Sequence, residues 1–203
     1  MKNSFMTYDR TTYQNAVKSN LEKNIFYHSL SVEACMGGLY DYLKENNRLD
    51  NNETSKEDWL LSGLIHDIDY SGDTKNDHPN KTKEVLAKYG LEIDDTVDSI
   101  IKAHAPELTG VKAENLAQWS IFCADSLTGL ITAVALIYPS KKLAEVKTSS
   151  VLKRFLKEPK FAAGTRRGEV KMCELETGLN IPLEKFIEIC LTSMQQIALE
   201  IGL

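Results

Sequence analysis

Apolar residues recur every three to four positions along most of this 203-residue chain, and that spacing constrains its fold more than any other feature. The period places apolar side chains on one face of a helix, whereas half-buried strands alternate apolar and polar residues. No persuasive series of alternating strands or hairpin turns interrupts it. The spacing therefore predicts an all-α fold, a compact helical bundle.

Local signals support several of the helix ends. Ser55 and Asp94 are residues that cap helix N-termini, Pro79 suits a first helical turn, and Gly90 and Gly178 are typical of positions where helices stop. The predicted helices cover about residues 9–20, 25–46, 55–67, 79–89, 94–103, 113–138, 148–156, 166–177 and 182–201.

Composition sets the class of protein. With 42% hydrophobic and 26% charged residues, the chain fits one domain, 1–203, around one substantial core. A net charge of -5 argues against a nucleic-acid polymer or an anionic membrane as partner, so we expect small-molecule partners. The four cysteines form no C-x-x-C pair and lie in apolar helical patterns, which predicts reduced thiols and a cytoplasmic location. No N-terminal signal region is apparent, and the longest uncharged apolar run, 126–140, falls short of the roughly 20 residues of a membrane span.

All four histidines fall at helix positions that face inward or at helix ends. His28 lies on an apolar stripe, and His66 and Asp67 end a helix within the stretch LLSGLIHDIDYSGD. His78 precedes a predicted helix start, and His104 continues a buried face. Burying such groups without partners costs several kcal/mol, so protein, water or a metal ion must satisfy them.

The most informative carboxylate is Asp125, inside the apolar segment WSIFCADSLTGLITAVALIY. No lysine or arginine lies in that segment to pair with it, and a bound divalent ion is one source of compensating charge. A single histidine on an apolar helix face is more often a hydrogen-bonded core residue than a metal ligand. The full set of four histidines with Asp67 and Asp125 favours a common metal site.

The order His28, His66-Asp67, His78, His104, Asp125 resembles the HD superfamily of metal-dependent phosphohydrolases, over roughly the first two-thirds of the chain. The resemblance implies an HD-type helical domain whose metal-binding core spans about residues 21–138, with C-terminal helices at about 148–203 completing it. It implies that His28, His66, Asp67 and Asp125 bind one metal, and that Asp67 bridges to a second metal bound by His78 and His104. The donors suit one or two divalent ions of Fe, Mn, Zn or Co and do not select among them.

The same resemblance implies an enzyme that cleaves a phosphoester or phosphoanhydride bond with a metal-bound hydroxide, with Asp67 central to catalysis. A small phosphorylated molecule, most reasonably a nucleotide, is the expected substrate. Two alternatives stay open: an HD-type diiron oxygenase that acts on a small molecule, and a non-catalytic sensor of metal or nucleotide. The sequence does not indicate the oligomeric state.

Four further residues are candidates for smaller roles. Asp69 is interpreted as a catalytic residue that orients a water or acts as a base, or else as an ordinary turn carboxylate. Lys81 is a candidate for substrate phosphate binding, or else an exposed lysine. In FAAGTRRGEV, Arg166 and Arg167 start a predicted helix, where guanidinium groups and backbone N–H groups suit a phosphate; solvated arginines are the alternative.

Overall fold

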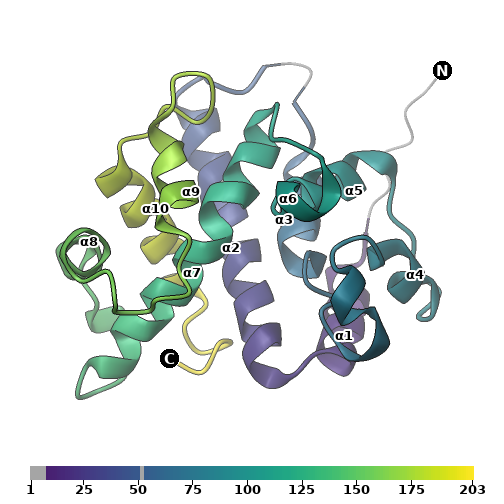
Figure 1. Ribbon diagram of the computed structural model, residues 1–203, viewed down its shortest axis with the longest axis horizontal. Coiled ribbons are helices and arrows are strands. Elements are labelled where there is room, and N and C mark those ends of the chain that lie inside the picture. Colours follow the sequence, from purple (N-terminus) through teal and green to yellow (C-terminus); the bar gives the residue numbers. More distant parts are fainter. Residues whose placement is uncertain (1–7, 51–52) are drawn as a thin grey trace.

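The computed structural model describes residues 8–50 and 53–203, and within those ranges every regular element is a helix (Figure 1). This confirms the predicted all-α class. The α-helices are α1 (Arg10–Asn20), α2 (Lys23–Glu45), α3 (Lys56–Ile65), α4 (Thr82–Ala87), α5 (Asp95–Lys102), α6 (Pro106–Thr109), α7 (Leu116–Ile137), α8 (Thr148–Lys157), α9 (Arg167–Lys171) and α10 (Leu183–Gln196). Three short 3-10 helices, η1 (Gly72–Asp77), η2 (Leu143–Glu145) and η3 (Met172–Glu174), lie between them.

The two longest helices, α2 and α7, run through the middle of the molecule and pack against each other (Figure 1). Helices α1 and α5 pack against α3 on one side, while α8, α9 and α10 pack against α7 on the other. Helix α10 also packs along α2, so the C-terminal helices share the core with the N-terminal ones. Segments far apart in sequence therefore meet around α2 and α7.

Helices α2 and α3 approach each other closely at Gly63. A Cβ atom built on Gly63 would lie 2.8 Å from the Cα and the backbone nitrogen of Glu33 on α2. Real Cβ atoms essentially never make such a contact with backbone, so a glycine is needed at this position. The missing side chain fixes the spacing of these two helices.

We expect Gly63→Ala to destabilise the fold by about 1–3 kcal/mol, because the added methyl group meets backbone that cannot rotate away. Chemical denaturation measures the change. The matched control is Gly168→Ala on α9, where no atom lies within 4 Å of the added Cβ. The control should not lose stability, since alanine is the better helix former. Equal stability of Gly63→Ala and wild type would contradict the close-contact interpretation.

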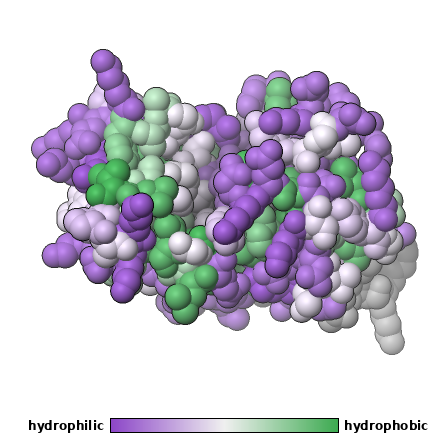
Figure 2. All heavy atoms as spheres, turned by 90° about the horizontal axis from the view of Figure 1, so that it is seen from below, coloured by the Kyte–Doolittle hydropathy of each residue, from purple (hydrophilic) through white to green (hydrophobic). Residues whose placement is uncertain are grey.

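Helix α7 is the central apolar helix of the core. By length and composition alone it could cross a membrane, but 67% of its most apolar window is buried inside the fold. Its buried side chains pack against α2, α5, α8, α9 and α10. Seen from below, the molecular surface is mostly hydrophilic, with a hydrophobic band over its left half (Figure 2). The apolar character of α7 is thus accounted for largely by the protein interior.

The structure confirms several predicted helix ends and corrects others. Ser55 forms a capping box with Asp58, Asp94 caps α5, and Gly90 adopts a left-handed conformation after α4. The helix predicted at 79–89 begins only at Thr82, because the backbone N–H of Lys81 is bound by a buried carboxylate, that of Asp69. The last predicted helix, 182–201, ends as an α-helix at residue 196 and continues as turns.

The segment predicted as one helix over 166–177 is two short helices, α9 and η3. The chain turns after η3, where the N–H of Ile181 donates to the carbonyl of Cys173 at 2.9 Å. The N-cap of α9 is Arg166, and no side chain caps this helix.

Candidate metal centre

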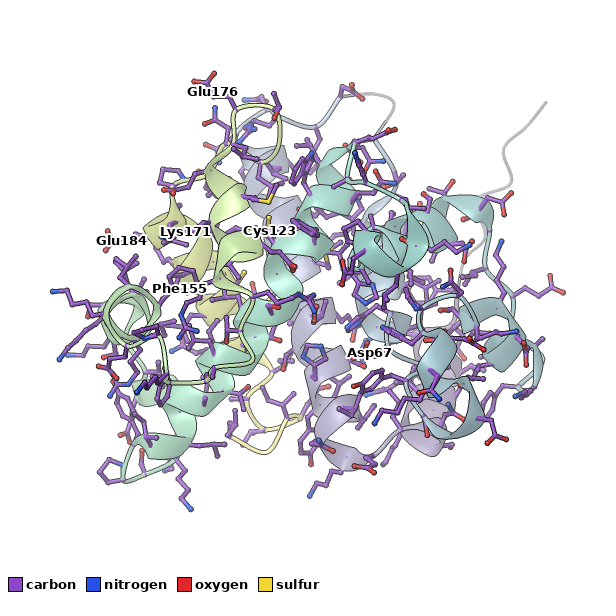
Figure 3. The ribbon with its side chains drawn as sticks, in the orientation of Figure 1. Asp67, Cys123, Phe155, Lys171, Glu176 and Glu184 are labelled. Carbon is purple, nitrogen blue, oxygen red and sulfur yellow. The ribbon has the colours of Figure 1, made fainter. Side chains whose placement is uncertain are left out.

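Six side chains from separate parts of the fold meet beside α2, near the middle of the molecule, where Figure 3 labels Asp67. They are the four histidines of the chain and two aspartates: His28 on α2, His66 and Asp67 at the end of α3, His78 after η1, His104 after α5, and Asp125 on α7. All four histidines are buried or half-buried, and His66 is completely buried.

The imidazole rings form two pairs. The Nε2 atoms of His28 and His66 lie 3.2 Å apart, and those of His78 and His104 lie 3.1 Å apart. Two imidazole nitrogens bound to one ion, at about 2.0–2.1 Å each, lie about 3.0–3.4 Å apart at ordinary ligand angles. Each pair therefore has the spacing of two ligands on one metal.

Asp67 lies between the two pairs. Its Oδ2 is 3.6 Å from His28 Nε2 and 3.5 Å from His66 Nε2, while its Oδ1 is 3.3 Å from His78 Nε2. The ligand atoms of Asp67, His28 and His66 form one compact group, and those of Asp67, His78 and His104 form another. One carboxylate oxygen is thus directed to each pair, which is the arrangement of a bridging ligand.

The other nitrogen of each ring is bound to an acceptor. His66 Nδ1 donates to the carbonyl of Gly63 (2.8 Å), and His104 Nδ1 donates to the carbonyl of Ile101 (2.5 Å). His78 Nδ1 donates to Asp69 Oδ1 at 2.6 Å. These acceptors place a proton on Nδ1 and leave Nε2 as the ligand atom.

His28 is held in the same tautomer by Thr128. The Thr128 hydroxyl donates to the backbone carbonyl of Asp125 at 2.8 Å, so its oxygen accepts from His28 Nδ1 at 2.9 Å. All four rings therefore turn Nε2 to the centre. Facing lone pairs repel unless a proton or a cation lies between them, so the donor set fits a pair of metal ions.

Asp125 completes the first group. Its Oδ1 lies 2.9 Å from His28 Nε2 and its Oδ2 accepts a hydrogen bond of 2.7 Å from Arg166. Burial opposes ionisation, but hydrogen bonds and charge from His28 and His66 outweigh it and hold the pKa of Asp125 well below its usual range. The cation missing from the sequence around Asp125 thus comes from Arg166, 41 residues away.

Two histidines of the centre differ in acidity. Burial opposes protonation of His66, but the carboxylates of Asp67 and Asp125 outweigh it and raise the pKa of His66 to about 9. Burial and the neighbouring charge of His66 lower the pKa of His104 to about 4. Near pH 7 the metal-free protein therefore carries a proton on His66 Nε2 and none on His104 Nε2.

We expect binding at the His28/His66 group to strengthen with pH, because a metal must displace the proton on His66. Apparent affinity should rise by about tenfold per unit from about pH 7 and level off above about pH 9. Calorimetric titration in buffers of different ionisation enthalpy measures the released proton. A flat profile over this range would contradict a protonated His66.

Asp69 is fully buried, and both of its oxygens are engaged. Its Oδ1 accepts from His78 and its Oδ2 accepts the backbone N–H of Lys81 at 2.7 Å. The carboxylate therefore lies behind the His78 ring, on the side away from the other ligands. This geometry fits a residue that orients His78 better than it fits a base in contact with water.

We expect Asp69→Asn to weaken metal binding at the His78/His104 group by about 10–100-fold, because the amide has only one acceptor oxygen for two donors. The ion at the His28/His66 group should be retained. Elemental analysis and metal titration measure both. Full metal occupancy with lost activity would instead favour the interpretation of Asp69 as a base.

The other predicted substrate residues lie in different surroundings. The Lys81 ammonium pairs with Glu84 at the surface (2.9 Å), and only its backbone N–H reaches the centre, through Asp69. Arg166 lies at the centre through Asp125. Arg167 donates to four backbone carbonyls, between residues 155 and 162, and so holds a loop. Of these three, the structure brings only Arg166 to the ligands by its side chain.

Sequence reasoning missed Thr128 and the pairing of Arg166 with Asp125. Thr128 is three residues after Asp125 on the same helix, so helical spacing alone indicates that the two share a face. No sequence signal joins Arg166 to Asp125, because tertiary packing makes that contact.

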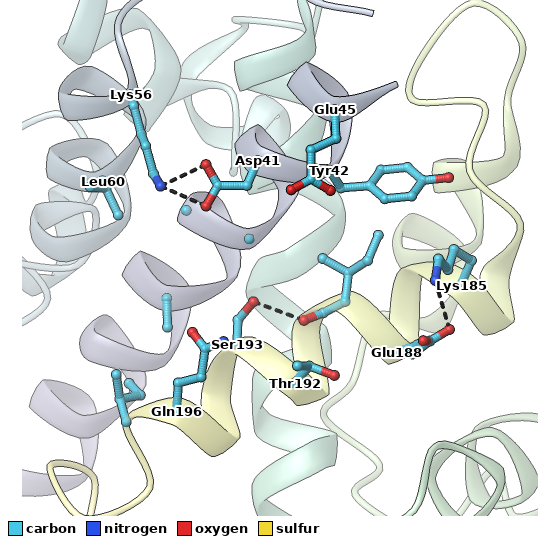
Figure 4. A pocket seen from close by; sticks show the side chains of 15 residues that line it. Asp41, Tyr42, Glu45, Lys56, Leu60, Lys185, Glu188, Thr192, Ser193 and Gln196 are labelled. Carbon is cyan, nitrogen blue, oxygen red and sulfur yellow. Dashed lines mark hydrogen bonds and ion pairs between the residues drawn. The ribbon is translucent and has the colours of Figure 1, made fainter. Parts of the chain in front are cut away.

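A groove of about 570 Å³ lies between α2, α3 and α10, and none of the candidate metal ligands lines it (Figure 4). Four of its five charged side chains pair with one another: Lys56 with Asp41 at 2.7 Å, and Lys185 with Glu188 at 3.1 Å. The groove offers no comparable set of converging donors, and the candidate site stays with the histidines.

Comparison with known proteins agrees with this geometry. The family model described as HD domain matches residues 25–130, a range that contains all six metal-ligand candidates and excludes Arg166. No curated protein and no solved structure gave a match. The match covers more than half of the chain and coincides with the His-Asp cluster. The chain belongs to the HD-domain family.

Proposed function

We propose that this protein is a metal-dependent phosphohydrolase that cleaves a phosphoester or phosphoanhydride bond in a small phosphorylated substrate, with nucleotides as the first class to test. The observation that carries the proposal is the pair of histidine groups joined by the two oxygens of Asp67. HD-domain proteins are mostly metal-dependent phosphohydrolases, which supports the same reading.

The donor set would hold one ion through His28, His66, Asp67 and Asp125, and a second through Asp67, His78 and His104. Divalent ions bound there would lower the pKa of a water and neutralise charge on phosphoryl oxygens. The mixed imidazole and carboxylate donors suit Fe, Mn, Zn or Co.

The chain's own residues organise this site. Each imidazole donates its Nδ1–H to one acceptor, which orients its Nε2 toward the candidate metal positions. The acceptors are Thr128, Gly63, Asp69 and Ile101. Arg166 holds Asp125 and leaves part of its guanidinium open, with its side chain 40% exposed. We assign Arg166 to the substrate phosphate, and Asp69 to positioning His78.

One experiment separates this function from its alternatives. The purified protein is stripped of metal and reloaded with Mn, Fe, Zn or Co, and phosphate release and oxygen consumption are then measured on a panel of nucleotides. Phosphate release that depends on metal supports the proposal. Oxygen consumption without phosphate release would replace it with a diiron oxygenase, and ligand binding without either reaction would replace it with a sensor.

A further inference from the structure

A pocket of about 340 Å³ opens directly beside two of the candidate ligands, His28 and Asp125. Its remaining walls are Ser126 and Gly129 on α7 and the segment 162–166, which connects α8 to α9. In Figure 1 this connection runs across α7. The pocket is therefore built partly from α2 and α7, which carry His28 and Asp125, and partly from a segment outside the family match.

Arg167 holds the chain that leads into segment 162–166, as far as Ala162 at the edge of the pocket. The guanidinium donates to the carbonyls of Phe155 (3.1 Å), Glu158 (3.3 Å), Phe161 (2.6 Å) and Ala162 (3.4 Å). The Thr165 N–H closes the turn by donating to the Ala162 carbonyl at 2.9 Å. These bonds anchor the start of segment 162–166 and close its turn, so they position this wall of the pocket beside α7.

The lining offers one charge for an anion. Arg166 is the single cation among the described residues that line the pocket. It donates Nη2 to Asp125 and Nε to Glu169, and three of its five N–H donors remain for another partner. A guanidinium next to the ligands suits one phosphoryl group, whereas a polyphosphate would call for several cations.

The rest of the lining is small and uncharged. Ser126 and Thr165 supply hydroxyls that make no hydrogen bond within the described chain, and glycine and alanine residues supply space. At Gly129 no atom lies within 4 Å of a built Cβ. The two hydroxyl groups can hydrogen-bond to a polar alcohol, and the open volume beside Gly129 leaves space for it.

We infer that this pocket binds the alcohol portion of a phosphomonoester, a sugar or nucleoside monophosphate. The phosphoryl group would accept from the open N–H donors of Arg166, beside the His28/Asp125 ligands. This inference rests on the proposed function and narrows its substrate class. In the reaction, water adds to phosphorus, the ester P–O bond breaks, the alcohol leaves with a proton, and inorganic phosphate forms.

The test fills the pocket without touching a ligand. Gly129→Leu places a side chain in the pocket, and Gly168→Leu is its matched control: both glycines are exposed and helical, and neither has an atom within 4 Å of its built Cβ. We expect Gly129→Leu to lower kcat/KM for sugar and nucleoside monophosphates at least tenfold. Metal content and the Kd for inorganic phosphate should stay within about twofold, because phosphate lacks the alcohol portion. Gly168→Leu should match wild type in all three.

Several results would overturn the inference. These are unchanged kcat/KM in Gly129→Leu, an equal loss in Gly168→Leu, a matching loss of inorganic phosphate affinity in Gly129→Leu, or triphosphates hydrolysed as efficiently as monophosphates. Each of these results would show either that the pocket does not bind the alcohol portion or that the substrate is not a phosphomonoester.

A binding experiment keeps this inference separate from the proposed function. If the wild-type protein hydrolyses no phosphoester, the proposed function fails, and binding of inorganic phosphate to the metal-loaded protein still tests the pocket. Arg166→Gln should raise the Kd for inorganic phosphate at least tenfold, with metal content measured in parallel. Equal phosphate affinity in Arg166→Gln and wild type would exclude the assigned phosphoryl position.

Discussion

Asp67→Ala should abolish the proposed phosphohydrolase activity, by about a thousandfold or more, and lower the bound metal at both groups. The reason is geometric: Asp67 is the side chain whose two oxygens face both histidine pairs. Without it, four imidazoles keep their positions but lose the anion that joins them and offsets the charge of two ions. Steady-state kinetics and elemental analysis of the purified variant measure both effects.

Asp98→Ala is the matched control for that variant. The side chains of Asp67 and Asp98 are 13% and 14% exposed, but Asp98 pairs with Lys102 on α5, away from the histidines. Asp98→Ala should keep full metal content and activity. Wild-type metal content and activity in Asp67→Ala would remove Asp67 from the centre of the mechanism.

The double variant His78→Ala/His104→Ala should lose about one metal equivalent per chain and at least a hundredfold in turnover. These two imidazoles are candidate ligands of the second ion, and Asp67 alone would not hold it. The His28, His66 and Asp125 donors should still hold the other ion. Elemental analysis beside wild type gives the stoichiometry, and kinetics gives the change in kcat and KM.

His28→Ala is the informative comparison for the double variant. It should weaken metal binding at the His28/His66 group and leave metal binding at the His78/His104 group unchanged. If the double variant keeps wild-type metal content while KM rises, those two histidines contact substrate phosphate. Equal metal and equal kinetics would return them to packing roles.

Much of the candidate ligand set could be predicted from the sequence, because each candidate ligand carries a local signal. His28 and His104 continue apolar stripes, His66 and Asp67 end a leucine-rich helix, and Asp125 interrupts an apolar one. The structure brings all of them together with His78. Helical periodicity also predicted the all-α fold, and short-range caps at Ser55 and Asp94 marked helix starts.

The rest depends on contacts between distant segments. The pairing of Arg166 with Asp125 has no local signature, because the two residues lie 41 positions apart on different elements. The carbonyls that accept from Arg167 lie only 5 to 12 residues earlier, but no residue pattern marks a backbone carbonyl as a partner. The helix predicted at 79–89 starts in the structure only at Thr82, because Asp69 accepts the backbone N–H of Lys81. A tertiary hydrogen bond there overrode the favourable position of Pro79 in a first helical turn.

The close contact at Gly63 links the packing of α2 and α3 to the geometry of the candidate metal centre. Gly63 fixes how near α3 comes to α2, and its carbonyl also orients His66, whose partner His28 lies on α2. The spacing of these helices therefore helps to set the distance between two donor atoms, the Nε2 atoms of His28 and His66. An ion of larger radius needs a wider gap, so the preference of the centre among metals would depend on a glycine that coordinates none of them. A search for variants with altered metal preference should accordingly begin in the α2–α3 packing and leave the ligands unchanged.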